Sequence, residues 1–487
     1  MIEKARDVVS KINKESLLSF WIITYVIRMS VPHLNYLFIG TTMTLLLFTF
    51  LRVEEGWSSI LKKTKPLVFF LILLIITSVS LLFSLVKVPR LLHEIVQIPM
   101  LLIFIFSLLV LVKSKADFDG FIKKLLHYFY YSSIIVSLIG VFKFICLSVG
   151  VELPLGAWYY PQGTSLTVDY NFYALALISG LISYFFLAAN SSIKYKLRFE
   201  SLFLVVVPIA TFGSGSRRGF LMIFGLYLTV LFFFMINKVL KKKIEGFRTS
   251  FLVKILKSLV VNVAIVYCLF FSFAAFKIEL PQGEKILAHN FRIYTTNMFY
   301  RYGLIFDGKV KFENVFDNMW YDKAKEKARE QVGADGLDVK LVPDNRMHTY
   351  SPRTKRWSYS VEYFRENYNN FQQWFGGGFG YMKAFGVKFG AKPMIIELEF
   401  DYPHNVFLSA LLSNGWVGFV LLVYLVLASI MRYVSARKTS IALLSMFLIS
   451  LLYVSTSANS FLAVPYFSVL LVIGLYSNSF LKKKADG

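Results

Sequence analysis

The residues best suited to bind a charged ligand lie in the segment Ser214-Gly215-Ser216-Arg217-Arg218-Gly219 of this 487-residue sequence. It places two arginines between two apolar stretches, and a charge at membrane depth is costly without a partner. Ser214 or Ser216 could cap the helix that follows, whose first N–H groups and dipole favour an anion. With two guanidinium groups added, the pattern predicts a phosphate or pyrophosphate site. The alternative is that both arginines only reach lipid headgroups.

A second candidate is the segment Asp401-Tyr402-Pro403-His404-Asn405, which directly precedes another apolar stretch. We expect Asp401 to be the N-cap and Pro403 to take an early helical position. His404 would then lie in the first turn, where the helix dipole keeps the imidazole neutral and able to accept a proton from a hydroxyl group. The alternative is a surface histidine satisfied by water. The histidines lack metal-ligand spacing, so no metal site is predicted.

Two further groups combine polar and aromatic residues. Arg353, Arg356 and Trp357 could hold a phosphate and stack on a sugar ring, or simply form a solvated helix start. Asp169 and Asn171 open an apolar stretch, where they could line a cavity or face water.

The composition indicates which elements position these residues. Hydrophobic residues make up 56% of the chain, charged residues only 17%, and the mean hydropathy is +0.59. Ordinary globular proteins are about 25% charged. A cytosolic enzyme, a disulfide-rich secreted protein and a disordered chain are therefore excluded. Cys146 and Cys268 fall within apolar stretches and read as core residues. The fold class predicted is an all-α polytopic membrane protein.

About twelve transmembrane helices are predicted from the apolar stretches. The first two stretches are separated only by Pro32 and His33, so one re-entrant hairpin is the alternative there. No signal peptide is expected, because another apolar stretch follows the first at once. The predicted spans are 17–31, 34–51, 66–86, 95–112, 125–147, 169–189, 200–213, 219–237, 255–276, 403–430, 441–456 and 461–480.

Basic residues gather on alternate connections between these spans, which predicts that those connections and both termini are cytoplasmic. The net charge of +24 then reflects topology, and nucleic acid is not needed to explain it. We expect an N-terminal bundle of about nine helices over 1–276, an extracytoplasmic loop over 277–400 and about three C-terminal helices over 401–487. Within the loop, an amphipathic helix carrying Trp357 and Phe364 should end at the turn formed by Gly376-Gly377-Gly378-Phe379-Gly380.

In their order along the chain, these segments resemble the O-antigen ligase and O-antigen polymerase family of bacterial envelope glycosyltransferases. The resemblance covers residues 169–418. It is carried by Asp169-x-Asn171-x-x-Ala174, by Ser216-Arg217-x-Gly219, by Arg353 and Trp357 ahead of the glycine-rich turn, and by Pro403-His404-Asn405-x-Phe407-Leu408 with Gly415-x-x-Gly418.

The resemblance implies transfer of a glycan from undecaprenyl diphosphate to an acceptor hydroxyl at the outer face of the bacterial cytoplasmic (inner) membrane. Arg217 and Arg353 would bind the departing pyrophosphate, and His404 would activate the acceptor for displacement with inversion, without metal, nucleotide sugar or other cofactor. Arg353 lies four residues before Trp357 where the family often shows three, so Arg356 competes for its role. The substrate-binding residues it suggests are Arg218, Arg356, Asp169, Asn171, Asn405 and Trp357.

The acceptor stays open at this point: lipid A core for a ligase, another lipid-linked glycan for a polymerase. A lipid-linked oligosaccharide flippase is the alternative from a different class. Transporters tend to show internal repeats, and none is evident in the sequence. A scaffold or sensor without catalysis would not need arginines at membrane depth.

Overall fold

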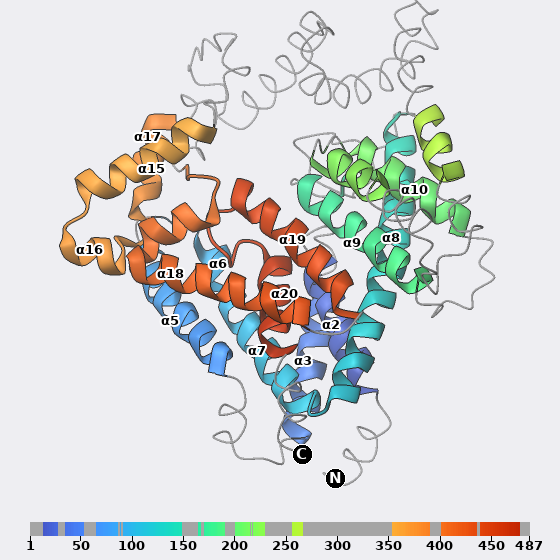
Figure 1. Ribbon diagram of the computed structural model, residues 1–487, viewed down its shortest axis with the longest axis horizontal. Coiled ribbons are helices and arrows are strands. Elements are labelled where there is room, and N and C mark those ends of the chain that lie inside the picture. Colours follow the sequence, from blue (N-terminus) through green and yellow to red (C-terminus); the bar gives the residue numbers. More distant parts are fainter. Residues whose placement is uncertain are drawn as a thin grey trace, which may run out of the picture. The chain divides into compact units, whose positions relative to one another are not determined.

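The computed structural model describes residues 13–27, 35–52, 65–85, 88, 91–148, 164–166, 170–189, 200–214, 216, 218–228, 256–265, 353–389, 401–435 and 439–477. Every regular element within these ranges is helical (Figure 1), which confirms the all-α class. The elements are α2 (Lys14–Ile27), α3 (Asn35–Leu51), α5 (Lys65–Leu85), α6 (Leu92–Ile95), α7 (Gln97–Leu111), α8 (Lys115–Ser148), α9 (Tyr170–Ala189), α10 (Glu200–Gly213), α15 (Arg353–Asn367), α16 (Asn370–Phe375), η4 (Gly378–Gly380), α17 (Tyr381–Phe389), α18 (Val406–Ser435), α19 (Thr439–Ser457) and α20 (Pro465–Tyr476). Two more apolar helices cover Arg218–Leu228 and Leu256–Ile265.

These helices follow the predicted apolar spans along the chain. Four of them are long and apolar enough to cross a membrane: Pro66–Leu85, Lys115–Cys146, Asn171–Ala188 and Val406–Ser435. Seven other predicted spans are matched by shorter apolar helices within the described residues, and α2 lies on the remaining one, so twelve spans stays a prediction. α2 and α3 pack as an antiparallel pair, with the Trp21 indole donating to the Thr42 hydroxyl over 2.9 Å.

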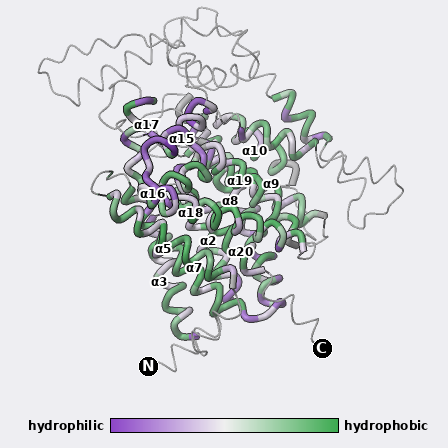
Figure 2. Tube along the Cα trace, turned by 60° about the vertical axis from the view of Figure 1, so that its left-hand side comes forward, coloured by the Kyte–Doolittle hydropathy of each residue, from purple (hydrophilic) through white to green (hydrophobic). Residues whose placement is uncertain are grey.

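Several helices carry exposed apolar stripes at helical spacing, which is the surface that a lipid environment accepts. On α5 the exposed stripe contains Val68, Ile72, Ile75, Val79 and Leu82; on α18 it contains Val420, Tyr424, Leu427, Met431 and Val434. Figure 2 shows hydrophobic residues along α5, α7 and α18, whereas hydrophilic residues gather on α15 and α16. This contrast fits a membrane protein with polar helices outside its spans.

The chain divides into two compact units that interleave along the sequence. Unit 1 comprises Met1–Leu18, Thr44–Gly120 and Trp320–Gly487, and unit 2 comprises Ser19–Met43 and Phe121–Met319. α8 begins in the first and continues in the second. The expected division at residues 276 and 400 concerns membrane topology and stays a prediction.

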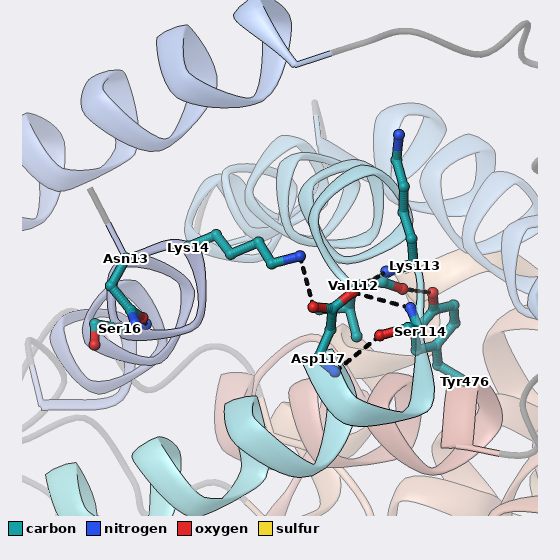
Figure 3. A network of polar contacts seen from close by, with 8 residues as sticks. All are labelled: Asn13, Lys14, Ser16, Val112, Lys113, Ser114, Asp117 and Tyr476. Atoms are coloured by element: carbon teal, nitrogen blue, oxygen red, sulfur yellow. Dashed lines mark hydrogen bonds and ion pairs between the residues drawn. The ribbon is translucent and has the colours of Figure 1, made fainter. Parts of the chain in front are cut away.

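Two polar clusters lie at opposite ends of α7 and α20 in unit 1. At one end Lys14 pairs with Asp117 over 2.6 Å, Asp117 accepts the Ser114 N–H over 3.0 Å, and the Tyr476 hydroxyl donates to the Val112 carbonyl (Figure 3). Three segments predicted to be cytoplasmic therefore meet at one end of the unit.

The other polar cluster is centred on the buried carboxylate of Glu94 in α6. It accepts hydrogen bonds from the Asn459 amide and from the Ser460 hydroxyl, the latter over 2.5 Å. The connections that hold these residues are both predicted to be extracytoplasmic. Because α7 and α20 each begin beside Glu94 and end beside the Lys14 cluster, they run parallel, as the predicted topology requires.

α18 is broken at Gly415, where φ is 66° and ψ is −163°. The break frees a carbonyl of the preceding turn at Leu412, which accepts the Gly377 N–H over 3.1 Å and the Tyr368 hydroxyl over 2.8 Å. The Ser80 hydroxyl of α5 donates to the next carbonyl, that of Ser413, over 3.2 Å. The carbonyls freed by the break are therefore satisfied internally, as a low-dielectric surrounding requires.

The predicted turn at 376–380 fits into this break. Gly376 has a φ of 87°, and a Cβ added there would lie 2.1 Å from the Ser413 carbonyl oxygen. A Cβ on Gly415 would lie 2.4 Å from the carbonyl carbon of Trp374. Both glycines are therefore required by left-handed backbone and by close approach of two backbones. Figure 1 shows the result, with α16 lying against the first part of α18 and α5 alongside.

Candidate functional site

In unit 1 the carboxylate of Asp401 binds two candidate residues at once. Arg356 donates to its Oδ2 through Nη2 over 2.5 Å and through Nε over 3.2 Å. His404 Nε2 lies 3.3 Å from its Oδ1, which also accepts the Tyr402 N–H over 2.8 Å. Sequence reasoning treated these residues separately and missed Asp401 as the group that joins them. The available signal was an acid three residues before His404.

Helices α15 and α17 contact the segment 401–404, which precedes α18. The Trp357 indole donates to the Pro403 carbonyl over 3.1 Å, and the Asp401 N–H donates to the Met382 carbonyl over 3.1 Å. The Arg356 guanidinium also lies over the Phe389 ring, 5.2 Å from its centroid. The carboxylate and the imidazole are therefore held by both backbone and side-chain contacts.

The expected helix start is wrong in its details. Asn405, not Asp401, is the N-cap of α18: its Oδ1 accepts the N–H groups of Phe407 over 2.9 Å and Leu408 over 3.1 Å. His404 thus precedes the helix, so the first-turn dipole argument for a neutral ring does not hold. The physical reason is that Asp401 is occupied by a guanidinium, whereas the Asn405 amide is well placed to cap.

His404 has the only left-handed backbone among the described residues other than glycine, with a φ of 56°. Such a conformation is uncommon for a side chain with a Cβ, and it is held only where surroundings fix it. Its side chain is 30% exposed, so the ring is partly accessible. Because Nε2 faces the carboxylate, Nδ1 is the ring nitrogen left for a ligand.

The charge state of Asp401 follows from its contacts. Burial by itself raises the pKa of this carboxyl, but the hydrogen bonds from His404 and Arg356 and the Arg356 charge outweigh it and hold the pKa below its ordinary value. Asp401 is therefore an anion at neutral pH, and it can stabilise an imidazolium formed at His404.

The two competing loop arginines differ in their surroundings. Arg353 is the first residue of α15 and is exposed, whereas Arg356 is buried against Asp401. Positions three and four apart share a helix face, so Arg353, Arg356 and Trp357 lie along one side of α15. Arg353 is the arginine that an external anion can reach without displacing Asp401.

In unit 2 Ser216 lies at the start of the helix Arg218–Leu228, beside the start of α9. Ser216 is the N-cap: its hydroxyl oxygen accepts the Gly219 N–H over 3.0 Å and its carbonyl accepts the Phe220 N–H over 2.9 Å. The same hydroxyl donates to Asn171 Oδ1 over 2.9 Å. Two helix N-termini therefore lie side by side, with Arg218 half-buried at one of them.

Such a pairing of N-termini favours an anion, because the positive ends of two helix dipoles lie close together. Arg217 and Asp169 lie outside the described residues, so their predicted roles are not tested by the geometry. Among the described residues, no group of three histidine, cysteine or acidic side chains has the spacing to hold a metal ion.

The comparisons with known proteins bear on both candidate sites. Residues 202–423 match the Wzy_C family, described as O-antigen ligase, and this stretch is a little under half of the chain. It contains Arg217 and Arg218 as well as Arg353, Arg356 and His404. No curated protein matches the chain.

Proposed function

From the O-antigen ligase family domain that residues 202–423 carry, we propose that the protein is a membrane glycosyltransferase of the ligase or polymerase type. It transfers a glycan from undecaprenyl diphosphate to an acceptor hydroxyl at the outer face of the cytoplasmic membrane. The acceptor is the lipid A core for a ligase and a second lipid-linked glycan for a polymerase. The observation that carries the proposal is the contact of His404 with Asp401 inside that domain.

In the proposed reaction His404 Nδ1 takes the proton of the acceptor hydroxyl. The acceptor oxygen forms a bond to the anomeric carbon of the donor while the bond from that carbon to the diphosphate oxygen breaks, which inverts the configuration. The electron pair leaves with undecaprenyl diphosphate. Asp401 stabilises the imidazolium and orients the ring, and its own pairing with Arg356 makes Arg356 a positioning residue.

The diphosphate is a good leaving group once positive groups stabilise its negative charge. We assign this role to Arg217 and Arg353, with Arg218 and the N–H groups beside Asn171 as further contacts. Asp169, Asn405 and Trp357 remain candidate substrate-binding residues. The amide oxygen of Asn405 is used as a helix cap, so its Nδ2 group is the part left for a ligand. A metal ion and a nucleotide sugar have no place in this scheme.

The polar cluster around Lys14 and Asp117 supports the proposed topology. It joins the start of α2, the α7–α8 turn and the end of α20, all predicted to be cytoplasmic. Both termini would then be cytoplasmic, and the segment 277–400 with His404 would face outward in a multi-pass protein of the bacterial inner membrane.

One observation favours the alternative of a lipid-linked oligosaccharide flippase. Broken helices are common in transporters, and α18 is broken at Gly415. However, the Leu412 carbonyl at this break is satisfied by Gly377 and Tyr368, and the Ser413 carbonyl by Ser80. This pattern fits a fixed structural joint rather than an ion or substrate site.

The deciding experiment is incubation of the purified full chain with lipid-linked repeat units, with and without lipid A core. Longer lipid-linked chains would identify a polymerase and glycosylated core a ligase. Lipid movement across reconstituted vesicles without any new glycosidic bond would support the flippase and exclude the transferase. The matched inactive control is His404→Asn, because asparagine tolerates left-handed backbone.

A further inference from the structure

Lys143 is a cation buried in the apolar part of α8. Lys143 is only 5% exposed, and its ammonium donates a hydrogen bond to the Ser165 carbonyl. Within the described part of the chain no carboxylate pairs with it. Burial of a charge without an opposite charge is expensive, so a single carbonyl is poor compensation.

The segment Thr164–Leu166 contacts both Lys143 and the end of α10. Ser165 is preceded by Thr164, whose N–H donates to the Gly213 carbonyl over 3.1 Å and whose hydroxyl donates to the Ala210 carbonyl. Thr164, Ser165 and Leu166 are each buried. Lys143 and the last turn of α10 therefore contact adjacent residues of one buried segment.

The last turn of α10 leads directly into the two helix N-termini described above. Gly213 is followed by the N-cap Ser216, which bonds to Asn171 at the start of α9 over 2.9 Å. Arg218 is half-buried at the start of its helix, whereas Lys143 is buried. Two cations, one buried and one half-buried, near two positive helix ends suit an anion with two charged groups better than one with a single group.

We propose that Lys143 is a further binding residue for the diphosphate of the lipid-linked donor, a role that rests on the proposed function. Its ammonium supplies a point charge, which complements the forked guanidinium of Arg218. The bound diphosphate provides an opposite charge, which no described residue supplies to Lys143. Lys143 takes no part in proton transfer.

The test is the binding of undecaprenyl diphosphate, undecaprenyl monophosphate and undecaprenol to purified full-length protein in detergent. Lys143→Gln keeps a donor for the Ser165 carbonyl but removes the charge. We expect it to weaken diphosphate binding about tenfold or more, since bonds to charged groups are the strong ones, and to leave undecaprenol binding unchanged. Lys143→Arg should restore most of the affinity. Lys123→Met, an exposed lysine of the same helix, is the matched control.

Thermal stability distinguishes this role from a structural one. A structural pin predicts that Lys143→Met lowers the Tm and that Lys143→Gln behaves as wild type. A binding residue kept buried at a cost predicts an unchanged or higher Tm for both variants, with a smaller ligand-induced rise in Tm.

The failures are distinguishable. If Lys143→Gln binds undecaprenyl diphosphate as tightly as wild type, the role of Lys143 is overturned while the proposed function stands. If the wild-type protein does not bind undecaprenyl diphosphate, both are overturned. A Lys143→Gln variant that loses affinity for undecaprenol to the same extent as for the diphosphate would also overturn the role, because the effect would then not concern charge.

Discussion

The two candidate sites handle charge in opposite ways. In unit 1 the charged groups compensate one another: Arg356, Asp401 and His404 form a contiguous set held by backbone contacts. In unit 2 the buried ammonium of Lys143 has a carbonyl as its partner, and two helix N-termini add further positive character. A self-compensated set is ready to orient a proton acceptor, whereas an uncompensated set gains most from an anionic ligand. The difference separates proton transfer from anion binding.

The largest effect is expected from His404→Asn. Because asparagine tolerates left-handed backbone, this variant removes the imidazole and keeps the local chain path. Loss of a general base typically costs about 100-fold or more in rate, so kcat for glycan transfer should fall by that amount. Binding of undecaprenyl diphosphate, the role proposed for the other site, should not change. Transfer at a near-normal rate would remove His404 from the mechanism.

The Arg356–Asp401 ion pair of this set can be removed with Arg356→Gln and with Asp401→Asn. Each single variant leaves one buried charge without its partner. For a well-buried pair this lowers the free energy of unfolding by about 3 kcal/mol or more. Because the two side chains are 10% and 13% exposed, we expect a loss of about 1–2 kcal/mol. The double variant should lose less than the sum. A double-mutant cycle on thermal unfolding in detergent measures this coupling, and strict additivity would show that the pair is not coupled.

The frame that supports the unit 1 site depends on Gly415. Gly415→Ala adds a Cβ to a residue with a φ of 66°, within 2.4 Å of the Trp374 backbone. Left-handed strain alone costs about 1–3 kcal/mol, so a clearly lower apparent Tm is expected. Gly380→Ala is the matched control, since nothing lies within 4 Å of its added Cβ. Equal Tm values for the two variants would contradict the interlocked arrangement.

A smaller effect is expected from Ser216→Ala in unit 2. It removes a helix N-cap and the bond to Asn171, and the loss of such a cap costs about 1 kcal/mol. The apparent Tm should therefore fall, and affinity for undecaprenyl diphosphate should also fall because the two helix N-termini are no longer bonded to each other, with kcat at saturating donor unchanged. Ser132→Ala, whose hydroxyl bonds only within α8, is the control. A change confined to kcat would place Ser216 outside the donor site.

The smallest effect concerns the protonation of Asp401. Its pKa in the folded protein is below the ordinary value of about 3.9, so its contribution to stability is present above that value and is lost as the pH falls through the folded pKa. The Tm difference between wild type and Asp401→Asn should stay constant from about pH 5 to 8 and shrink below about pH 4. A difference that grows on acidification would reverse the sign assigned here.

The sequence indicated which residues lie close together better than it indicated their partners. His404, Arg356 and Trp357 were identified from residue type and spacing, and the structure brings all three to one segment in unit 1. The link between Arg356 and His404, Asp401, was assigned to the wrong role, since a cap and an ion pair look alike in a sequence. Lys143 is visible in the sequence as a lysine within an apolar span. Its burial and its contact with Ser165 cannot be predicted from the sequence.

The sequence by itself determined the helical class, the positions of the apolar helices and the residues able to do chemistry. Those features depend on hydropathy and spacing within a few turns, which are local properties. The tertiary structure alone decided which polar groups meet. Arg356 and Asp401 are 45 residues apart, and the glycine turn closes on the break in α18 through backbone bonds that any residue can make. Pairings of that kind follow from the packing of whole helices, and so they leave little trace in the order of residue types.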